Sequence, residues 1–185
     1  DKFVVLYAGA HGMSNDLDIV LDAADQLRAR SDIVIAFVGD GKEKSALMER
    51  AARIGLENVK FIAPVPKTEM GQALAASNAC IAILKPIEMY KTVYPNKVFD
   101  YMAAGRAVIL AIDGVIRQVV EKAAAGICIP PGDAGRLAAA IRLLANDPHG
   151  TKQMGMRGRK AIEAQFDRRK LSSEMAEIFE QLIRG

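Results

Sequence analysis

Residues 96–109 read NKVFDYMAAGRAVI, and they join the start of a helix to a strand that is apolar on both faces. Asp100 within it is the only acidic residue between Glu88 and Asp113. A carboxylate on an otherwise apolar helical segment must be solvated at a crevice, paired with a cation, or used to bind a ligand. The stretch therefore predicts a ligand-facing helix start that leads into a buried parallel strand.

Five other short apolar runs share the character of this strand, and helical patterns separate them. The six runs are 3–8, 33–38, 59–62, 79–84, 107–111 and 126–129. Such runs are typical of parallel strands with helices on both faces, and right-handed crossovers then give a doubly wound sheet. We therefore expect an α/β fold with a six-stranded, parallel, Rossmann-like sheet, and ligands beyond the carboxyl ends of its strands.

Two helical patterns within the chain have clear ends. Apolar spacing predicts one helix over 16–30 and another over 133–146, with Asp133 as the N-cap of the second and Asp147-Pro148 as its end.

The C-terminal region, residues 149–185, has a helical pattern only. Its final stretch, 167–184, carries one apolar stripe: Leu171, Met175, Ile178, Phe179 and Leu182. Such a stripe packs a helix on its own domain or, in a fragment, covers a missing lobe.

Composition bounds the class of protein. The 185 residues are 51% hydrophobic and 25% charged, which predicts a single domain over 1–185 with a full core. The net charge of +3 suits an anionic small molecule or a membrane-surface neighbour but falls short of a nucleic-acid footprint. Aromatic residues make up 5% and no Trp is present, so no base-stacking platform is expected.

Three further features bear on compartment and completeness. Cys80 and Cys128 lie far apart in apolar runs, which predicts free thiols in a reducing cytoplasm. No apolar run approaches the roughly 20 residues of a membrane span. The chain enters a strand almost at once and has no initiator Met, so we expect a fragment of a longer protein.

The loop after the first run reads Tyr7-Ala8-Gly9-Ala10-His11-Gly12. It keeps two glycines of a GxGxxG fingerprint but has Tyr7 in place of the first, which argues against a dinucleotide site. Gly9 and Gly12 either let backbone amides approach a phosphate or supply the angles of a tight turn. His11 is a lone histidine, and such residues are more often incidental than catalytic.

Residues 39–45, GDGKEKS, only superficially resemble a P-loop, because Ala36 and Glu43 occupy positions where that motif needs Gly and Ser or Thr. Lys44 there either reaches a phosphate or is simply solvated. The sequence contains no HExxH, GxSxG or His/Cys cluster. Positive charge for an anion must therefore come from helix N-termini, loop amides and lysines: Lys85, Lys91 and Lys97.

The long loop 84–97 follows the fourth run, where the strand order is expected to reverse. Pro95 fits a helix entry and leaves free amides over 96–99 that can point at an anion. Asp100, one turn further, is placed to accept hydrogen bonds from vicinal hydroxyls. The alternative for Asp100 is a favourable interaction with the N-terminal dipole of its own helix.

These features together resemble the C-terminal, donor-binding lobe of GT-B glycosyltransferases of the large retaining family 4, or group 1. A branch of the family that builds bacterial surface polysaccharides looks similar here, with Asn96-Lys97 before the acid. The resemblance covers nearly all 185 residues. It rests on 7–12, 37–41, 58–66 and above all 100–109.

The chain also departs from the family pattern. Members typically carry two glutamates eight positions apart; Asp100 matches the second, and Thr92 stands in place of the first, which is linked to the donor sugar. Ala10 and Asn15 replace the Arg and Lys that are usual after the first glycine.

The resemblance implies retaining transfer of a sugar from a nucleotide-diphosphate sugar, expected to be a UDP-sugar, to a polysaccharide or lipid-linked acceptor. It implies no cofactor and no metal, and it leaves the catalytic residue unassigned. The implied site residues are Gly9, Gly12, Asn96, Lys97 and Val98 on the diphosphate, Asp100 on the ribose, and Pro64 and Val65 near the base.

The implied partners are the nucleotide-sugar and an N-terminal acceptor lobe of the same protein, with no nucleic acid. The resemblance implies a cytoplasmic location and is compatible with peripheral association at the inner membrane through the full-length protein. The isolated domain is expected to be inactive. Three alternatives stay open: an NAD(P)-binding oxidoreductase domain, a nucleotide-sugar epimerase and a non-catalytic nucleotide-binding module.

Overall fold

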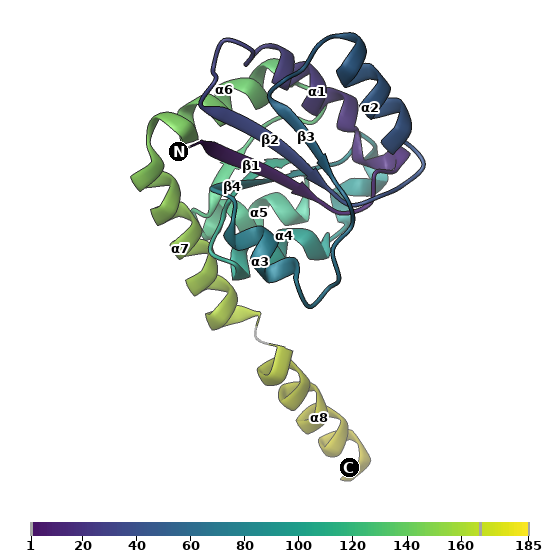
Figure 1. The fold of residues 1–185 in the computed structure, drawn as a ribbon. Helices are drawn as coiled ribbons and strands as arrows, with labels where there is room; N and C mark the ends of the chain where they lie inside the picture. The colour runs from purple at the N-terminus through teal and green to yellow at the C-terminus, as the bar shows by residue number, and fades with distance from the viewer. Residues whose placement is uncertain (1, 167, 185) are drawn as a thin grey trace.

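The computed structural model describes residues 2–166 and 168–184, which form a parallel six-stranded sheet with helices on both faces (Figure 1). The strand order is β3-β2-β1-β4-β5-β6. The strands are β1 (Phe3–Ala8), β2 (Ile33–Val38), β3 (Val59–Ile62), β4 (Ala79–Ile83), β5 (Ala107–Ala111) and β6 (Gly126–Cys128). All six predicted strands are confirmed, and the strand order reverses between β1 and β4.

Residues alternate between two cores because neighbouring side chains of a strand point to opposite faces. In β1, Val5 and Tyr7 face one core, which α1 (Leu17–Asp25), α2 (Lys44–Arg53) and α6 (Ala134–Asn146) cover. Leu6 and Ala8 face the other, which α3 (Met70–Ala75), α4 (Asn96–Ala103) and α5 (Val115–Lys122) cover. The two 3₁₀ turns are η1 (Met13–Asn15) and η2 (Glu88–Thr92). The predicted doubly wound α/β fold is therefore confirmed.

The segment from α4 to β5 folds as its sequence predicts. Gly105 takes a φ of +68°, and its amide donates to Met102 O at 2.9 Å. The next amide, of Arg106, donates to Tyr101 O at 3.0 Å, so a left-handed glycine ends the helix. Two residues later, β5 begins and is buried along its whole length.

The first predicted helix is shorter than expected. α1 ends at Asp25 instead of continuing to residue 30, because the chain tightens into turns: the amides of Leu27 and Arg28 donate to carbonyls three residues earlier. Asp16 does not act as a side-chain cap and has a left-handed φ of 46°.

The predicted N-cap of α6, Asp133, and the predicted end of that helix at Asp147-Pro148 are confirmed, since α6 ends at Asn146. Asp133 Oδ1 accepts from the amide of Arg136 at 2.8 Å and caps α6. Asp147 caps α7 (Pro148–Gln165) in the same way, accepting from Gly150 N at 2.8 Å. α7 packs closely on the α4–β5 turn: a Cβ at Gly155 would lie 2.0 Å from Gly105 O.

α8 (Arg168–Arg184) follows α7 and stands away from the sheet in Figure 1. Its apolar residues Met175, Ile178, Phe179 and Leu182 are 58–73% exposed. The side chain of Leu171, the first residue of the predicted stripe, lies outside the described residues. The stripe is thus not packed on this domain over 175–182.

Cys80 and Cys128 are both free thiols, as predicted. Burial raises the pKa of Cys80 to about 12 and that of Cys128 to about 11. Within residues 2–166 and 168–184, no helix has the length and apolarity that a membrane crossing requires.

Candidate functional site

The loops that follow β1, β2 and β4 are tied together at the carboxyl edge of the sheet. The amide of Gly9 donates to Val38 O at 3.0 Å, and that of His11 to Asp40 O at 2.8 Å. On the other side, Lys85 N donates to Ser14 O at 3.0 Å. The β1 loop therefore lies between its two neighbours, where the strand order reverses and open α/β sheets bind ligands.

The glycines of these loops have two different origins. Gly9 has a φ of +142°, and a Cβ on Gly39 would lie 2.0 Å from Gly9 O, so backbone geometry explains both. Gly12 has an ordinary φ of −114°, and its Cβ would meet nothing closer than Asn15 Nδ2 at 3.8 Å. The packing of the described chain therefore gives no reason for glycine at position 12, whereas close approach by a ligand would.

Lys97 reaches from α4 to the β1 loop. Its Nζ donates to Tyr7 Oη at 2.9 Å and to Asn15 Oδ1 at 3.2 Å. Both partners are neutral, and the ammonium is half-buried. Burial lowers the pKa of Lys97 to about 8, still leaving it mostly charged at neutral pH. Within the described part of the chain, this positive charge has no carboxylate partner, and it lies at the switch point.

The start of α4 offers further donors. Pro95 precedes the helix with φ −65° and ψ 121°. Within the described part of the chain, the amides of Asn96 and Lys97 have no acceptor. The amide of Val98 donates to Pro95 O at 3.0 Å, so it is already engaged in the first turn. Two of the three predicted amides are therefore free for an anion.

Asp100 lies in the second turn of α4 and is exposed, and its carboxylate has no partner among the described residues. No acidic residue lies in the first turn of this helix. Since the helix dipole acts mainly within the first turn, it does not explain Asp100 well. Thr92, where the family has its other acid, is exposed and donates to Met89 O at 3.0 Å.

Pro64 and Val65 follow β3 and so lie at the same edge of the sheet, two strands from β1. Pro64 is exposed, and Val65 packs partly against the core that contains Leu6. The structure thus places all the predicted residues at one edge and brings Lys97 to the β1 loop. Among the described residues, no hydrogen bond or ion pair joins Pro64 or Val65 to Asp100.

Sequence reasoning missed three contributors. Tyr7 and Asn15 accept hydrogen bonds from Lys97. From the sequence, Tyr7 was noted only because it replaces the first glycine of the fingerprint, and Asn15 only because it replaces the family's lysine. Tyr101 is the third: its hydroxyl donates to Ala8 O and accepts from Ala8 N, both at 3.0 Å, and so anchors α4 to β1. The signal was a tyrosine in an apolar helical segment, whose hydroxyl needs a partner when buried.

The surroundings of His11 and Lys44 indicate structural roles for both side chains. His11 is buried beside the rings of Tyr7, Phe37 and Phe61, and neither ring nitrogen has a partner among the described residues. Burial, helped by Lys44, lowers the pKa of His11, so it is neutral. Lys44 Nζ donates to Gly39 O at 2.7 Å and Ile62 O at 3.3 Å, so its ammonium is occupied by strand-end carbonyls.

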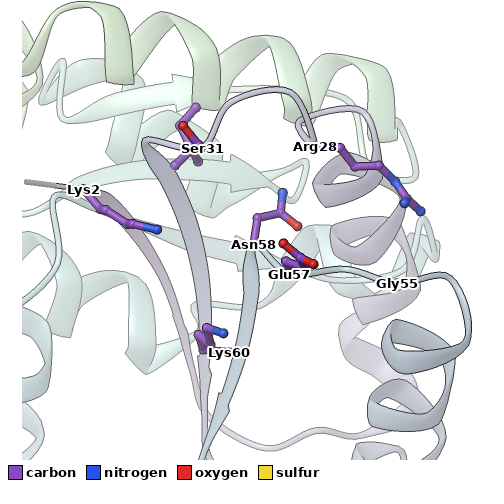
Figure 2. Close-up of a pocket in the computed structure, with 8 residues that line it drawn as sticks. Lys2, Arg28, Ser31, Gly55, Glu57, Asn58 and Lys60 are labelled. Atoms are coloured by element: carbon purple, nitrogen blue, oxygen red, sulfur yellow. The ribbon is translucent and has the colours of Figure 1, made fainter.

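A hollow of about 620 Å³ lies at the opposite, amino edge of the sheet (Figure 2). Lys2, Asn58 and Lys60 line it, together with Arg28, whose guanidinium is engaged by Asp25 and the carbonyl of Ile54. Because parallel sheets bind ligands at their carboxyl edge, this hollow is not the predicted donor site. In the described ranges, no group of three or more His, Cys, Asp and Glu residues could hold a metal ion.

Comparison with known sequences assigns the chain to one family. The family described as glycosyl transferases group 1 matches residues 2–147. The chain is 28% identical over 145 residues to WcaI of Escherichia coli K12, whose name assigns it to glycosyl transfer in colanic acid biosynthesis. That match covers 77% of this chain and 35% of WcaI. A glycogen synthase of Mycobacterium tuberculosis is 20% identical, and the match covers 98% of this chain and 43% of the synthase. The chain thus spans less than half the length of these relatives.

Solved structures have the same fold. HepE of Anabaena, in complex with UDP-glucose, superposes with a TM-score of 0.85 at 22% identity, covering 98% of this chain and 49% of HepE. The C-terminal domain of LpcC, a group 1 glycosyl transferase of Francisella tularensis, gives a TM-score of 0.77 at 15% identity. That match covers 90% of this chain and 87% of the LpcC domain.

Proposed function

This chain belongs to the group 1 glycosyltransferases and has the fold of one GT-B lobe, and we propose that it binds the nucleotide-sugar donor of a longer enzyme. The observation that carries the proposal is the half-buried ammonium of Lys97, which has only neutral partners at the switch point. A diphosphate is the ligand class that such a charge, beside free helix amides, recognises best.

The donor diphosphate would lie across the mouth of the β1 loop and the start of α4. Lys97 supplies the counter-charge, and the amides of Asn96 and Lys97 donate hydrogen bonds. Gly9 leaves room for the Lys97 ammonium, since a Cβ there would lie 3.2 Å from Nζ. Gly12 leaves room for the ligand. Val98 contributes less than the sequence predicts, because its amide already bonds to Pro95 O.

The ribose and the base of the donor would bind along the same edge of the sheet. Asp100 accepts hydrogen bonds from the ribose hydroxyls, and Pro64 and Val65 adjoin the base. In the reaction, the bond between the anomeric carbon and the diphosphate oxygen breaks, a bond from that carbon to the acceptor hydroxyl oxygen forms with retention, and the hydroxyl proton passes to the leaving diphosphate. Negative charge then develops on the leaving diphosphate, and fixed donors such as Lys97 stabilise it without reorganisation. No cofactor or metal enters this proposal.

The acceptor, a polysaccharide or lipid-linked sugar, would be held by an N-terminal lobe of the same polypeptide. The exposed stripe of α8 is the surface on this chain that suits such a lobe, since Met175, Ile178 and Phe179 are unpacked here. The isolated domain would bind donor without transferring sugar. Two free thiols suit the cytoplasm, and the full-length protein could associate peripherally with the inner membrane.

The oxidoreductase, epimerase and non-catalytic readings are not favoured, because the matched family consists of glycosyltransferases. Tyr7 also occupies the position where a dinucleotide fingerprint needs its first glycine.

Titration calorimetry of the chain with UDP, GDP, uridine and NADH tests the proposal. We expect UDP to bind and Lys97→Met to weaken UDP by about 10- to 100-fold, with uridine affinity unchanged. Lys60→Met, which removes the same charge from the amino-edge hollow, is the matched control and should leave UDP binding intact. Binding of NADH but of neither nucleoside diphosphate would contradict the proposal.

A further inference from the structure

Four polar groups at the β1 loop form a closed ring of hydrogen bonds. Tyr7 Oη donates to Ala10 O at 2.7 Å, and Asn15 Nδ2 donates to the same carbonyl at 3.0 Å. Lys97 Nζ closes the ring by donating to Tyr7 Oη and Asn15 Oδ1 at 2.9 and 3.2 Å. The ring therefore consists of one ammonium and three neutral groups.

The ring fixes each member in one orientation. Because the Tyr7 hydroxyl gives its proton to Ala10 O, only its lone pairs face Lys97. Because the Asn15 amide nitrogen bonds to Ala10 O, its oxygen must face the ammonium. Lys97 uses two of its three donors in the ring, and the third has no acceptor among the described residues. The ring solvates the ammonium but does not neutralise it.

The members of this ring are also the positions that break the expected sequence patterns. Tyr7 replaces the first glycine of the fingerprint, and Ala10 and Asn15 replace the usual Arg and Lys. A glycine at 7 would remove one acceptor of the ammonium, and a lysine at 15 would place a second cation beside Lys97. The side chains at positions 7 and 15 thus act together on one lysine, whereas Ala10 contributes only its backbone carbonyl.

We propose that Tyr7 and Asn15 are positioning residues that aim the Lys97 ammonium at the donor diphosphate. This rests on the proposed function, since the anion they serve is the diphosphate of the nucleotide-sugar. The Lys97 ammonium reaches the β1 loop from α4, and neutral groups of that loop set its direction. A diphosphate then receives a charge that no protein carboxylate competes for.

The first test needs no nucleotide. The pKa of Lys97 is measured by NMR on ¹³C-labelled lysine in three proteins: the unchanged chain, Tyr7→Phe and Asn15→Asp. Tyr7→Phe removes an acceptor from the ammonium and should lower the Lys97 pKa below its starting value of about 8. Asn15→Asp adds a carboxylate and should raise it. If neither substitution moves the Lys97 pKa, the ring is not formed and the inference is wrong.

The second test measures UDP and uridine affinity in the same proteins. We expect Tyr7→Phe to weaken UDP about 3- to 10-fold and Asn15→Asp by more, with uridine unchanged. In a Lys97→Met background, Tyr7→Phe should cause no further loss, because a positioning residue acts only through the lysine. Tyr90→Phe is the matched control: its hydroxyl bonds to Ser14 Oγ at 2.8 Å in the same loop region but does not touch Lys97.

The outcomes separate the two proposals. UDP binding that needs Lys97 but is insensitive to Tyr7→Phe and Asn15→Asp overturns this inference and leaves the proposed function standing. An equal loss from Tyr7→Phe with and without Lys97 also overturns it, since the effect would then be structural. If the unchanged chain binds neither UDP nor GDP, the proposed function fails and the inference fails with it.

Discussion

At the scale of single residues, the site depends on how each charge is paired. Lys91 is paired with Glu88 at 2.6 Å, and Lys44 bonds to strand-end carbonyls. Lys97 has neutral partners only, and the carboxylate of Asp100 has none among the described residues. Groups left without an opposite charge at the ligand-binding edge of a sheet are the ones that a ligand can use.

Asp100→Asn should weaken binding of UDP by about 5- to 50-fold and leave stability unchanged, because the side chain is exposed and has no hydrogen bond or ion pair with another described residue. The measurement is calorimetry with UDP and with 2′-deoxy-UDP. The deoxy ligand should bind the unchanged chain weakly and be insensitive to the substitution. An equal loss of affinity for both ligands would mean that Asp100 does not bind the ribose hydroxyls.

His11→Leu should raise the free energy of unfolding by about 1 kcal/mol at pH 7, because the buried imidazole nitrogens have no hydrogen-bond partner among the residues that the structure describes. The native pKa of His11 is below its ordinary 6.5, so the unfolded chain binds the proton first as the pH falls. Titration of His11 therefore leaves the free energy of unfolding unchanged well above pH 6.5 and lowers it progressively as the pH falls below that value.

Denaturant unfolding between pH 5 and 8 measures both effects. His11→Leu should flatten the fall in stability below pH 6.5, whereas the exposed His149→Gln is the control and should not. An unchanged pH profile in His11→Leu would mean that His11 is protonated or solvated in the native state.

At the scale of elements, the sequence predicted strands better than it predicted side-chain networks. Period and apolarity located all six strands, because burial on both faces of a sheet is a local property of each run. The end of α1 was missed, since competing turn bonds at Leu27 and Arg28 decide it. The ring around Lys97 joins residues up to 90 positions apart, and no local pattern encodes that contact.

The two glycines of the β1 loop, Gly9 and Gly12, are expected to be glycine for different reasons: Gly9 for its backbone conformation and Gly12 for close approach of the ligand. Gly12→Ala should leave stability unchanged, because its φ is −114° and its Cβ site is open, but should weaken UDP by about tenfold or more. Gly9→Ala is the contrasting variant: its φ of +142° should cost about 1–3 kcal/mol of stability. Thermal unfolding and UDP titration check both variants. Unchanged UDP affinity in Gly12→Ala would mean that Gly12 does not lie against the ligand.

At the scale of the whole molecule, the described residues form one lobe, and the apolar residues of α8 over 175–182 are exposed. Phe166 packs on Phe99 with ring centroids 5.1 Å apart, whereas α8 beyond it exposes its apolar residues. A chain ending at Phe166 should therefore unfold within about 2 °C of the original and bind UDP equally well. It should also self-associate less in sedimentation, because an exposed apolar stripe is removed. A large drop in the unfolding temperature would mean that α8 is part of this domain's core.

The most direct measurement is ¹⁵N NMR of the labelled chain during titration with UDP. Binding at the switch point predicts the largest amide shifts over residues 9–15 and 96–100, with small shifts at the amino edge. Shifts concentrated on Lys2, Asn58 and Lys60, which line the hollow of Figure 2, would contradict a donor site at the carboxyl edge.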